Sequence, residues 1–294
     1  MKMMKAVLFV ICEGIVMENT DTSLERLNFT FHRSFALKRQ PMSSICMLAK
    51  KSNVPLSKKY LLKNIKIGTI YAEAFPRYCY GAGLINNKKD GLTNFGDHAI
   101  FSDSTLSDNR TLWLLHYHMS MIDGPGPEFW NHLFISFFKP GNTFSRDEIK
   151  EAIATRYWES TGKLLAEKSI NSTTYAFINS YTQEEGLGNL GILSNITEDY
   201  FEVKQPYFHY IWVIAYALCD YWAKVYPDNN SLTLDRLLTS ELPKYFFLSK
   251  DDFEAILNEL KLFGFLEIHR IAQPFQVFLK YGIEFPLTRL FENG

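Results

Sequence analysis

The sequence contains few cysteines, and none are spaced to share a metal ion. Cys12, Cys46, Cys79 and Cys219 lie far apart in a chain of 294 residues, and no CxxC pair occurs. Zinc sites and the disulfide frameworks of small secreted domains both depend on clustered cysteines. The spacing therefore argues against both and indicates reduced thiols in a cytoplasmic protein.

The sequence also lacks a hydrophobic run that could cross a membrane. The apolar run from Ala6 to Cys12 is far shorter than the roughly 20 residues that a spanning helix needs. No small-x-small cleavage site follows it, which argues against a signal peptide. We expect residues 1–28 to be a poorly packed tail. The alternatives are a short buried strand, or a start codon assigned too early, with Met17 as the true beginning.

Acidic residues are almost absent from the stretch between Arg33 and Lys89. Its one acid is Glu73, and its net charge is +11, whereas the whole chain carries −1 and the remainder therefore −12. A charge split of this size within a near-neutral protein predicts a surface that binds a polyanion. The basic residues of the stretch are Arg33, Lys38, Arg39, Lys50, Lys51, Lys58, Lys59, Lys63, Lys66, Arg77, Lys88 and Lys89.

The residue pattern from Phe29 onward predicts a strand and then two short helices. Apolar positions alternate between Phe29 and Lys38, which is typical of a half-buried strand, and Pro41 would end it. A serine at 43 or 44 can cap one helix, and Ser57 can cap the next, because serine accepts a hydrogen bond from a free N–H of the first turn.

A third helix and a hairpin are expected to complete this unit. The helix would cover about 67–80 and end at Gly81 or Gly83, since glycine reaches the left-handed conformation that a helix end requires. Residues 84–85 and 92–95 would then pair as a hairpin. Three helices followed by a hairpin predict a winged helix whose third helix reads the DNA major groove.

The rest of the chain predicts a helical middle and a second winged-helix-like unit. Residues 111–119 are apolar on nearly all sides, Ser145 and Glu148 form a capping box, and residues 190–193 and 200–203 alternate as a strand pair. Near the C-terminus, Ser249 can cap a helix that Gly264 ends, with two strands after it. That helix carries Asp251, Asp252, Glu254 and Glu259, so we expect it to pack or to bind a partner rather than DNA.

We therefore expect an α+β protein that is mostly helical. Its predicted parts are the tail of residues 1–28, a basic winged-helix DNA-binding domain over 29–102, a helical middle with a small hairpin over 103–205, and a winged-helix-like domain over 206–294. The residues predicted to contact DNA are Arg33, Lys38, Arg39, Lys58, Lys59, Lys63, Lys66, Arg77, Lys88 and Lys89. The alternative is a solvated basic face without a ligand.

Candidate catalytic residues are sparse. His32 lies at the edge of the basic stretch and could act as a general acid or base, or it could fix the strand to the helices through hydrogen bonds. Glu202 and Lys204 match half of a nuclease E-x-K motif, which is also common on surface strands. His118 could meet Asp123 and His132 across the Gly-Pro turn as a metal site, whereas His116 is expected to be a core histidine.

Several motifs, taken in order, resemble one bacterial family. They are Phe29-x-x-His32-x-x-Phe35-x-Leu37-Lys38, Arg77-Tyr78-x-x-Gly81-Ala82-Gly83-Leu84-Ile85, Thr111-Leu112-Trp113-Leu114-Leu115-His116 and Leu187-x-x-Leu190-Gly191-Ile192-Leu193. Together they are similar to the SspB-like DNA-nicking family of single-strand DNA phosphorothioation systems. The family often has Gly at the position of Phe31, Glu at Arg33 and Arg at Lys38, so this chain resembles a more aromatic and more basic subgroup.

The resemblance implies a protein that nicks one DNA strand so that sulfur can replace a non-bridging phosphate oxygen, in a phage-defence system related to restriction–modification. It implies a cysteine desulfurase, an ATPase and an ATP-pyrophosphatase-like protein as partners, and a divalent metal such as Mg²⁺ as a cofactor. A homodimer would suit duplex DNA. The alternatives are a non-catalytic DNA-binding adaptor or transcription regulator, and a module whose basic face meets an acidic protein.

Overall fold

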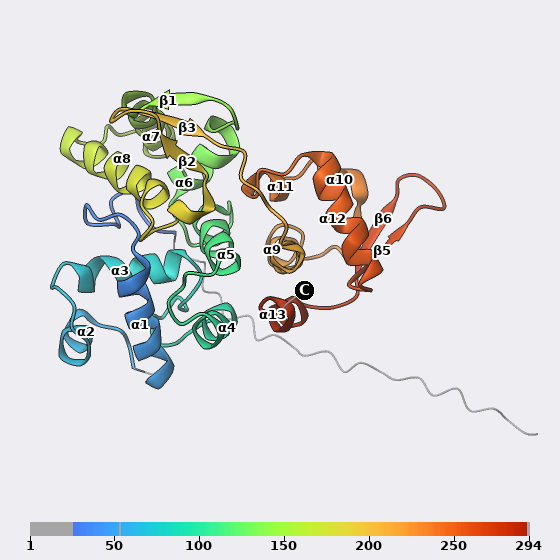
Figure 1. Ribbon diagram of the computed structural model, residues 1–294, viewed down its shortest axis with the longest axis horizontal. Coiled ribbons are helices and arrows are strands. Elements are labelled where there is room, and N and C mark those ends of the chain that lie inside the picture. The colour runs from blue at the N-terminus through green and yellow to red at the C-terminus, as the bar shows by residue number, and fades with distance from the viewer. Residues whose placement is uncertain (1–25, 53, 293–294) are drawn as a thin grey trace, which may run out of the picture.

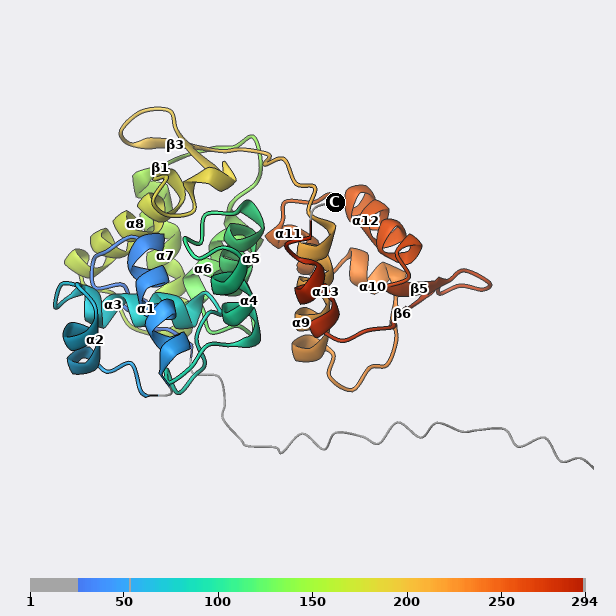
Figure 2. The same ribbon diagram turned by 60° about the horizontal axis from the view of Figure 1, so that its bottom comes forward.

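The computed structural model describes residues 26–52 and 54–292, and it forms two lobes side by side (Figure 1). The first lobe contains the helices and strands up to Val203, and the second contains those from Ile211 onward (Figures 1 and 2). The fold is α+β and mostly helical, as predicted. Of the predicted tail, only Arg26, Leu27 and Asn28 fall within the described residues, and the Leu27 N–H donates to the Pro125 carbonyl at 3.0 Å.

The predicted strand from Phe29 to Lys38 is wrong, because the chain forms consecutive turns there. Phe35 N–H donates to the His32 carbonyl at 2.9 Å, and Arg33 and Ser34 adopt positive φ angles of 50° and 68°. The side chains of Phe29 and Phe31 are buried. Their alternation thus reflects burial of aromatic rings under the turns, and the backbone is bent rather than extended.

The first two helices are α1 (Arg39–Lys51) and α2 (Lys58–Asn64). Helix α1 begins earlier than predicted, and Pro41 lies in its first turn, where a missing N–H costs no intrahelical hydrogen bond. The predicted cap of α2 is confirmed, since the Ser57 side chain accepts from the Tyr60 N–H.

The next helices are α3 (Tyr71–Gly81) and α4 (Asn94–Ser102). Gly83 follows α3 with a φ of 74°. The predicted hairpin is reduced to a single bridge between Ile85 and Leu92. Thr93 then caps α4, accepting from the Gly96 N–H at 2.9 Å. The residues expected to form the second strand therefore begin a helix.

Five further helical segments complete the first lobe: α5 (Asn109–Ser120), α6 (Glu128–His132), the π-helical turn η1 (Leu133–Phe137), α7 (Arg146–Thr161) and α8 (Glu167–Thr182). The side chains from Thr111 to Ser120 are all buried, so α5 is the central helix that the sequence predicts. The capping box of Ser145 and Glu148 at the start of α7 is also confirmed.

A small antiparallel sheet covers one end of the first lobe. Its strands are β1 (Thr143–Ser145), β2 (Leu193–Asn195) and β3 (Tyr200–Val203), in the order β1-β3-β2. Phe144 pairs with Phe201, and Leu193 pairs with Val203. The predicted strand pair is thus present, although its first strand starts at Leu193, after the short 3-10 turn η2 (Gly188–Leu190).

The second lobe starts with α9 (Ile211–Val225), followed by β4 (Leu232–Thr233), α10 (Leu234–Leu238), α11 (Leu242–Tyr245), α12 (Lys250–Leu262), β5 (Leu266–His269), β6 (Gln276–Leu279) and α13 (Glu284–Arg289). Its sheet has the order β4-β6-β5, with Ile268 opposite Val277. Ser249 caps α12 and Gly264 follows it with a φ of 74°, as predicted.

Contacts across the chain join the predicted parts. The Leu37 N–H donates to Ser180 on α8 at 2.9 Å, and Asn94 on α4 donates to Glu284 on α13. The boundary at residue 102 stays a prediction. Within residues 26–52 and 54–292, no helix has both the length and the apolar character needed to cross a membrane.

Candidate functional site

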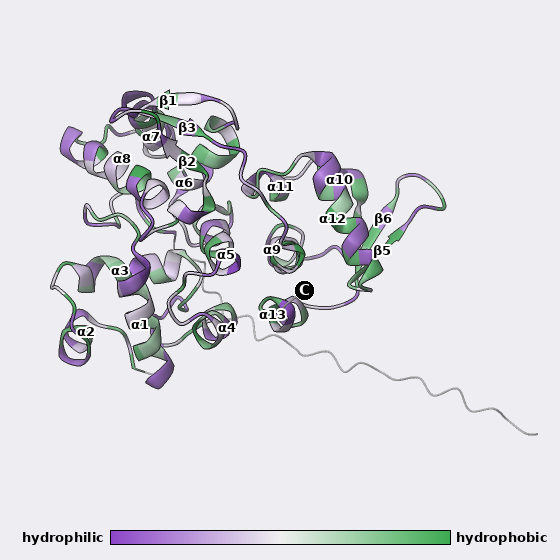
Figure 3. Cartoon of the chain, in the orientation of Figure 1, coloured by the Kyte–Doolittle hydropathy of each residue, from purple (hydrophilic) through white to green (hydrophobic). Residues whose placement is uncertain are grey.

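The exposed basic residues gather on α2 and the loop after it. Lys59, Lys63 and Lys66 are exposed and make no ion pair within the described part of the chain. Lys59 and Lys63 are four residues apart and share a helix face. Helix α2 contains no acidic residue. We refer to these three residues as the lysine face; Figure 3 shows hydrophilic residues on α2 and at the nearby end of α1.

Two other basic residues of the stretch are held by its one acid. Glu73 accepts from Lys58 at 2.6 Å and lies 3.4 Å from Arg33. The hydrogen bond from Lys58, together with its charge, lowers the pKa of the Glu73 carboxyl below its usual value. The Arg77 guanidinium, four residues on, donates to the Phe31 carbonyl at 3.4 Å.

Of the remaining predicted DNA contacts, Lys38, Arg39 and Lys89 have partners within the protein, whereas Lys88 does not have one among the described residues. Lys38 pairs with Glu185 at 2.6 Å, and Arg39 donates to the carbonyls of Glu184 and Glu185 at the opposite end of α1 from Lys51. Lys89 lies over the Tyr80 ring, 5.5 Å from its centroid. Lys88 is exposed and unpaired among the described residues.

Helix α3 does not present the surface expected of a DNA-reading helix. Residues Ala72, Ala74, Phe75, Pro76 and those from Tyr78 to Gly81 are all buried. Aromatic packing explains this, because the Phe31 and Tyr78 rings meet edge to face at 4.8 Å. Helix α2, in contrast, carries exposed lysines.

His32 is buried, with 1% of its surface exposed. Its Nδ1 accepts from the Ser34 N–H at 2.9 Å, so Nε2 carries the proton and donates to Thr173 Oγ1 on α8 at 3.1 Å. Burial lowers the pKa of His32 to about 4. These hydrogen bonds fix the turn that contains His32 and join it to α8. A catalytic role for His32 stays a prediction.

The other histidine predictions have different outcomes. His116 is a core histidine as expected, because Nδ1 meets Tyr181 Oη at 2.7 Å and Nε2 meets the Tyr245 carbonyl at 2.8 Å. His118 does not meet Asp123 and His132, and instead its Nε2 lies 2.9 Å from Tyr216 Oη. Within residues 26–52 and 54–292, no group of three or more His, Cys, Asp or Glu side chains could hold a metal ion.

Glu202 and Lys204 of the E-x-K motif, and the cysteines Cys46 and Cys79, do not have surroundings that indicate catalysis. Glu202 and Lys204 pair with each other at 2.5 Å on the surface of β3. The sulfur atoms of Cys46 and Cys79 lie 3.8 Å apart as buried free thiols between α1 and α3. Burial raises the pKa of the Cys79 thiol, which makes it a poor nucleophile.

A pocket between the lobes, with mostly apolar walls and a few polar groups, was not predicted from the sequence. A cavity of about 270 Å³ is lined by Asn87 and Phe95 from the first lobe, by His118 on α5, and by Tyr216, Asp220 and Lys224 on α9. We refer to it as the interlobe pocket. The three α9 residues recur every four positions and so share one helix face, a spacing that is visible in the sequence.

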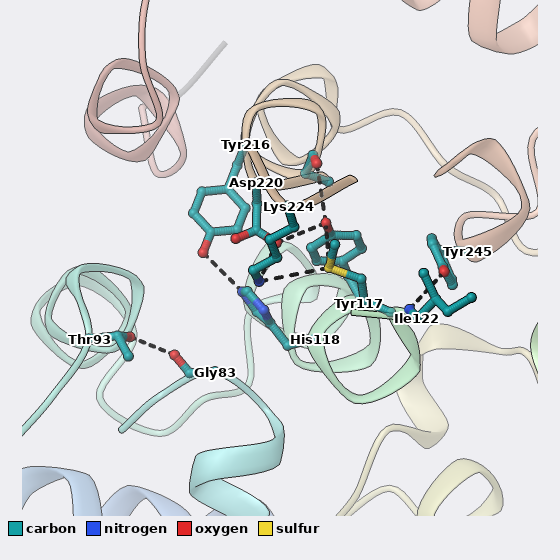
Figure 4. Close-up of polar contacts among 11 residues, drawn as sticks. Gly83, Thr93, Tyr117, His118, Ile122, Tyr216, Asp220, Lys224 and Tyr245 are labelled. Carbon is teal, nitrogen blue, oxygen red and sulfur yellow. Dashed lines mark hydrogen bonds and ion pairs between the residues drawn. The ribbon is translucent and has the colours of Figure 1, made fainter. Parts of the chain in front are cut away.

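The polar groups of the interlobe pocket are joined by hydrogen bonds (Figure 4). Asp220 Oδ2 accepts from Tyr117 Oη at 2.9 Å and from Lys224 Nζ at 2.8 Å. Burial lowers the pKa of His118 to about 4. The His118 ring covers Gly83, where an added Cβ would lie 2.6 Å from ring atoms, so only glycine fits this close approach.

The burial of His32 predicts a pH-dependent stability that the variant His32→Gln should reduce. Unfolded His32 binds a proton near pH 6.5, whereas the folded residue binds one only near pH 4. The contribution of neutral His32 to stability is therefore complete above pH 6.5 and is lost as pH falls toward 4. Near pH 5 the free energy of unfolding should fall less steeply in the variant than in the parent, by up to about 1.4 kcal/mol for each pH unit. Urea unfolding at several pH values measures this, and equal slopes would contradict it.

Two solved structures and one family model are similar to this chain, whereas no curated protein matches it. The crystal structures are one of SspB and one of SspB bound to a magnesium ion; each has a TM-score of 0.72 and 16% identity, and each comparison covers 90% of this chain and 87% of the other. At that identity the likeness shows the fold alone. Residues 29–281 match the family described as Protein of unknown function (DUF4007). The protein therefore belongs to the DUF4007 family.

Proposed function

We propose that this chain is a DNA-binding protein that nicks one strand during phosphorothioate modification of DNA in a phage-defence system. The observation that carries the DNA-binding part is the lysine face, because Lys59, Lys63 and Lys66 are exposed without a paired acid in the described part of the chain. Unpaired lysines gain most from phosphates, since binding releases the counterions that DNA holds.

Glu73 keeps part of the positive charge out of this contact. Arg33 and Lys58 share its carboxylate, so they bind a phosphate only by exchanging one anion for another. Ion pairs at exposed positions are weak, about 0–1 kcal/mol, and a DNA phosphate can compete with one. The lysine face thus makes the first contact, and Arg33 and Lys58 are secondary.

We propose the second lobe as the winged-helix unit of the chain. It has a helix, a strand, further helices and a hairpin, with β4 beside the last strand, β6. Asp251 and Asp252 are exposed in the first turn of α12, and Glu259 is exposed near its end. Like charge repels phosphate, so this lobe is proposed to meet a protein partner, such as the desulfurase, the ATPase or the ATP-pyrophosphatase-like protein of the same system.

The nicking part of the proposal rests on the family resemblance and the SspB fold. Magnesium binds SspB in one of the similar crystal structures. The described residues of this chain do not offer a group of three His, Cys, Asp or Glu ligands. No metal site is therefore assigned among these residues. The same observation favours a second candidate, a non-catalytic DNA-binding adaptor that recruits the sulfur-insertion enzymes.

Removing the lysine face should weaken DNA binding and its salt dependence together. The triple variant Lys59→Gln, Lys63→Gln, Lys66→Gln should lower the slope of log K against log salt by about 0.9 for each phosphate that the protein no longer neutralises. Fluorescence anisotropy with a labelled duplex between about 50 and 200 mM salt measures the slope.

A matched control separates a local contact from net charge. The variant Lys139→Gln, Lys163→Gln, Lys168→Gln removes the same charge from exposed lysines elsewhere on the first lobe. It should keep a slope close to that of the parent. If the two triple variants lose affinity equally, the lysine face has no special role.

Supercoiled plasmid tests the nicking activity. With Mg²⁺ present, the parent protein should convert plasmid to open circles, and the lysine-face variant should do so far more slowly because it binds less DNA. A contaminating nuclease would be equally active in both preparations. If His32 only fixes the turn, the His32→Gln variant should still nick the plasmid. Loss of nicking in a folded His32→Gln variant would support a catalytic role for His32. DNA binding by the parent without any open circles would favour the adaptor.

A further inference from the structure

We propose that the interlobe pocket binds a single nucleotide, with its base between aromatic side chains and its hydrogen-bonding edge toward Asp220 and Lys224. The inference rests on the proposed function, because the nucleotide is taken to be a unit of the bound DNA strand. A volume of about 270 Å³ suits a small ligand, since pockets for drug-sized molecules begin near about 300 Å³.

The walls of the pocket are aromatic and apolar. Tyr80, Phe95 and Tyr216 line it, together with Ile283 and Leu287 from the second lobe. The Phe95 and Tyr216 rings lie 5.7 Å apart at 45°. Aromatic rings stack on any base. Inorganic phosphate would gain nothing from these walls, and a purely apolar molecule would make no hydrogen bond to the Asp220–Lys224 pair.

The polar groups at one wall match the edge of a base. Both hydrogen bonds to Asp220 are made by Oδ2, so Oδ1 accepts none from the described residues. Lys224 has three donors, of which one is used by Asp220 and one lies toward the Met121 sulfur. A free acceptor beside an ammonium donor is complementary to the donor and acceptor that every base presents side by side.

Asn87 in the pocket lining and the residue after it also suit a nucleotide. The Asn87 amide makes no hydrogen bond within the described part of the chain. The next residue, Lys88, is exposed and unpaired among the described residues. Lys88 is the exposed positive group next in sequence to the pocket lining, and we propose that it meets the phosphate, while the lining residues Asp220 and Lys224 form an ion pair with each other. The arrangement therefore places the phosphate outside and the base inside.

Isothermal titration calorimetry with the four deoxynucleoside monophosphates tests the proposal on the full chain. At least one should bind with a Kd of about 1 mM or tighter, and deoxyribose 5-phosphate and inorganic phosphate should bind far more weakly. The variant Asn87→Trp, which adds a large ring to the pocket lining, should weaken binding about tenfold or more. The matched variant Asn142→Trp, on an exposed loop, should leave it unchanged. Asp220→Asn should also weaken binding, and circular dichroism verifies that each variant is folded.

The outcomes separate this inference from the proposed function. If no monophosphate binds, or if Asn87→Trp binds as well as the parent, the nucleotide pocket is wrong, and a lysine-face effect on duplex binding would still support DNA binding. If monophosphates bind but single-stranded oligonucleotides do not, the pocket holds a free nucleotide and the link to DNA is overturned. An oligonucleotide whose affinity drops in Asn87→Trp, but not in Asn142→Trp, supports the strand as the source.

Discussion

Hydrogen bonds of one buried histidine join the two lobes through the protein interior. His116 lies on the central helix α5, and its two nitrogens contact Tyr181 on α8 and the carbonyl of Tyr245 on α11. A carbonyl only accepts, so Nε2 carries the proton and Tyr181 donates to Nδ1. Trp130 in turn donates to Tyr181 at 2.7 Å. Burial lowers the pKa of His116 to about 4, so the ring is neutral and this network stays intact at neutral pH.

The buried histidines are neutral, whereas the charged side chains of the basic stretch lie on the surface. Histidines 32, 116 and 118 are buried and neutral at pH 7. The basic stretch places its charge outside, and Glu73 neutralises part of it near α3. What remains is concentrated on α2 and the loop after it. Binding to a polyanion thus requires no rearrangement of the core. The basic stretch also contributes to the interlobe pocket, because Asn87 lines the pocket and Lys88 is the next residue.

Local signals in the sequence predicted three helix caps, because caps depend on neighbouring residues, but the cap expected at Ser43 or Ser44 is wrong, since both lie inside α1 and Lys38 is at its N-cap. Ser57, Ser145 and Ser249 each cap a helix where expected. Predictions of features that depend on tertiary contacts were wrong. The alternation from Phe29 matched a strand, but ring burial produced it, and α3 had the length of a reading helix but lies in the core. The pocket joins residues about 100 positions apart, although the spacing of Tyr216, Asp220 and Lys224 was visible.

The most direct test of the central claim is lysine footprinting of the full chain with and without duplex DNA. Acetylation at low salt followed by mass spectrometry reports the accessibility of each lysine. The account predicts that Lys59, Lys63 and Lys66 are protected by DNA and exposed again at high salt, while Lys139, Lys163 and Lys168 react equally in both states. Protection of the second group, or no protection of the first, would contradict a DNA-binding lysine face.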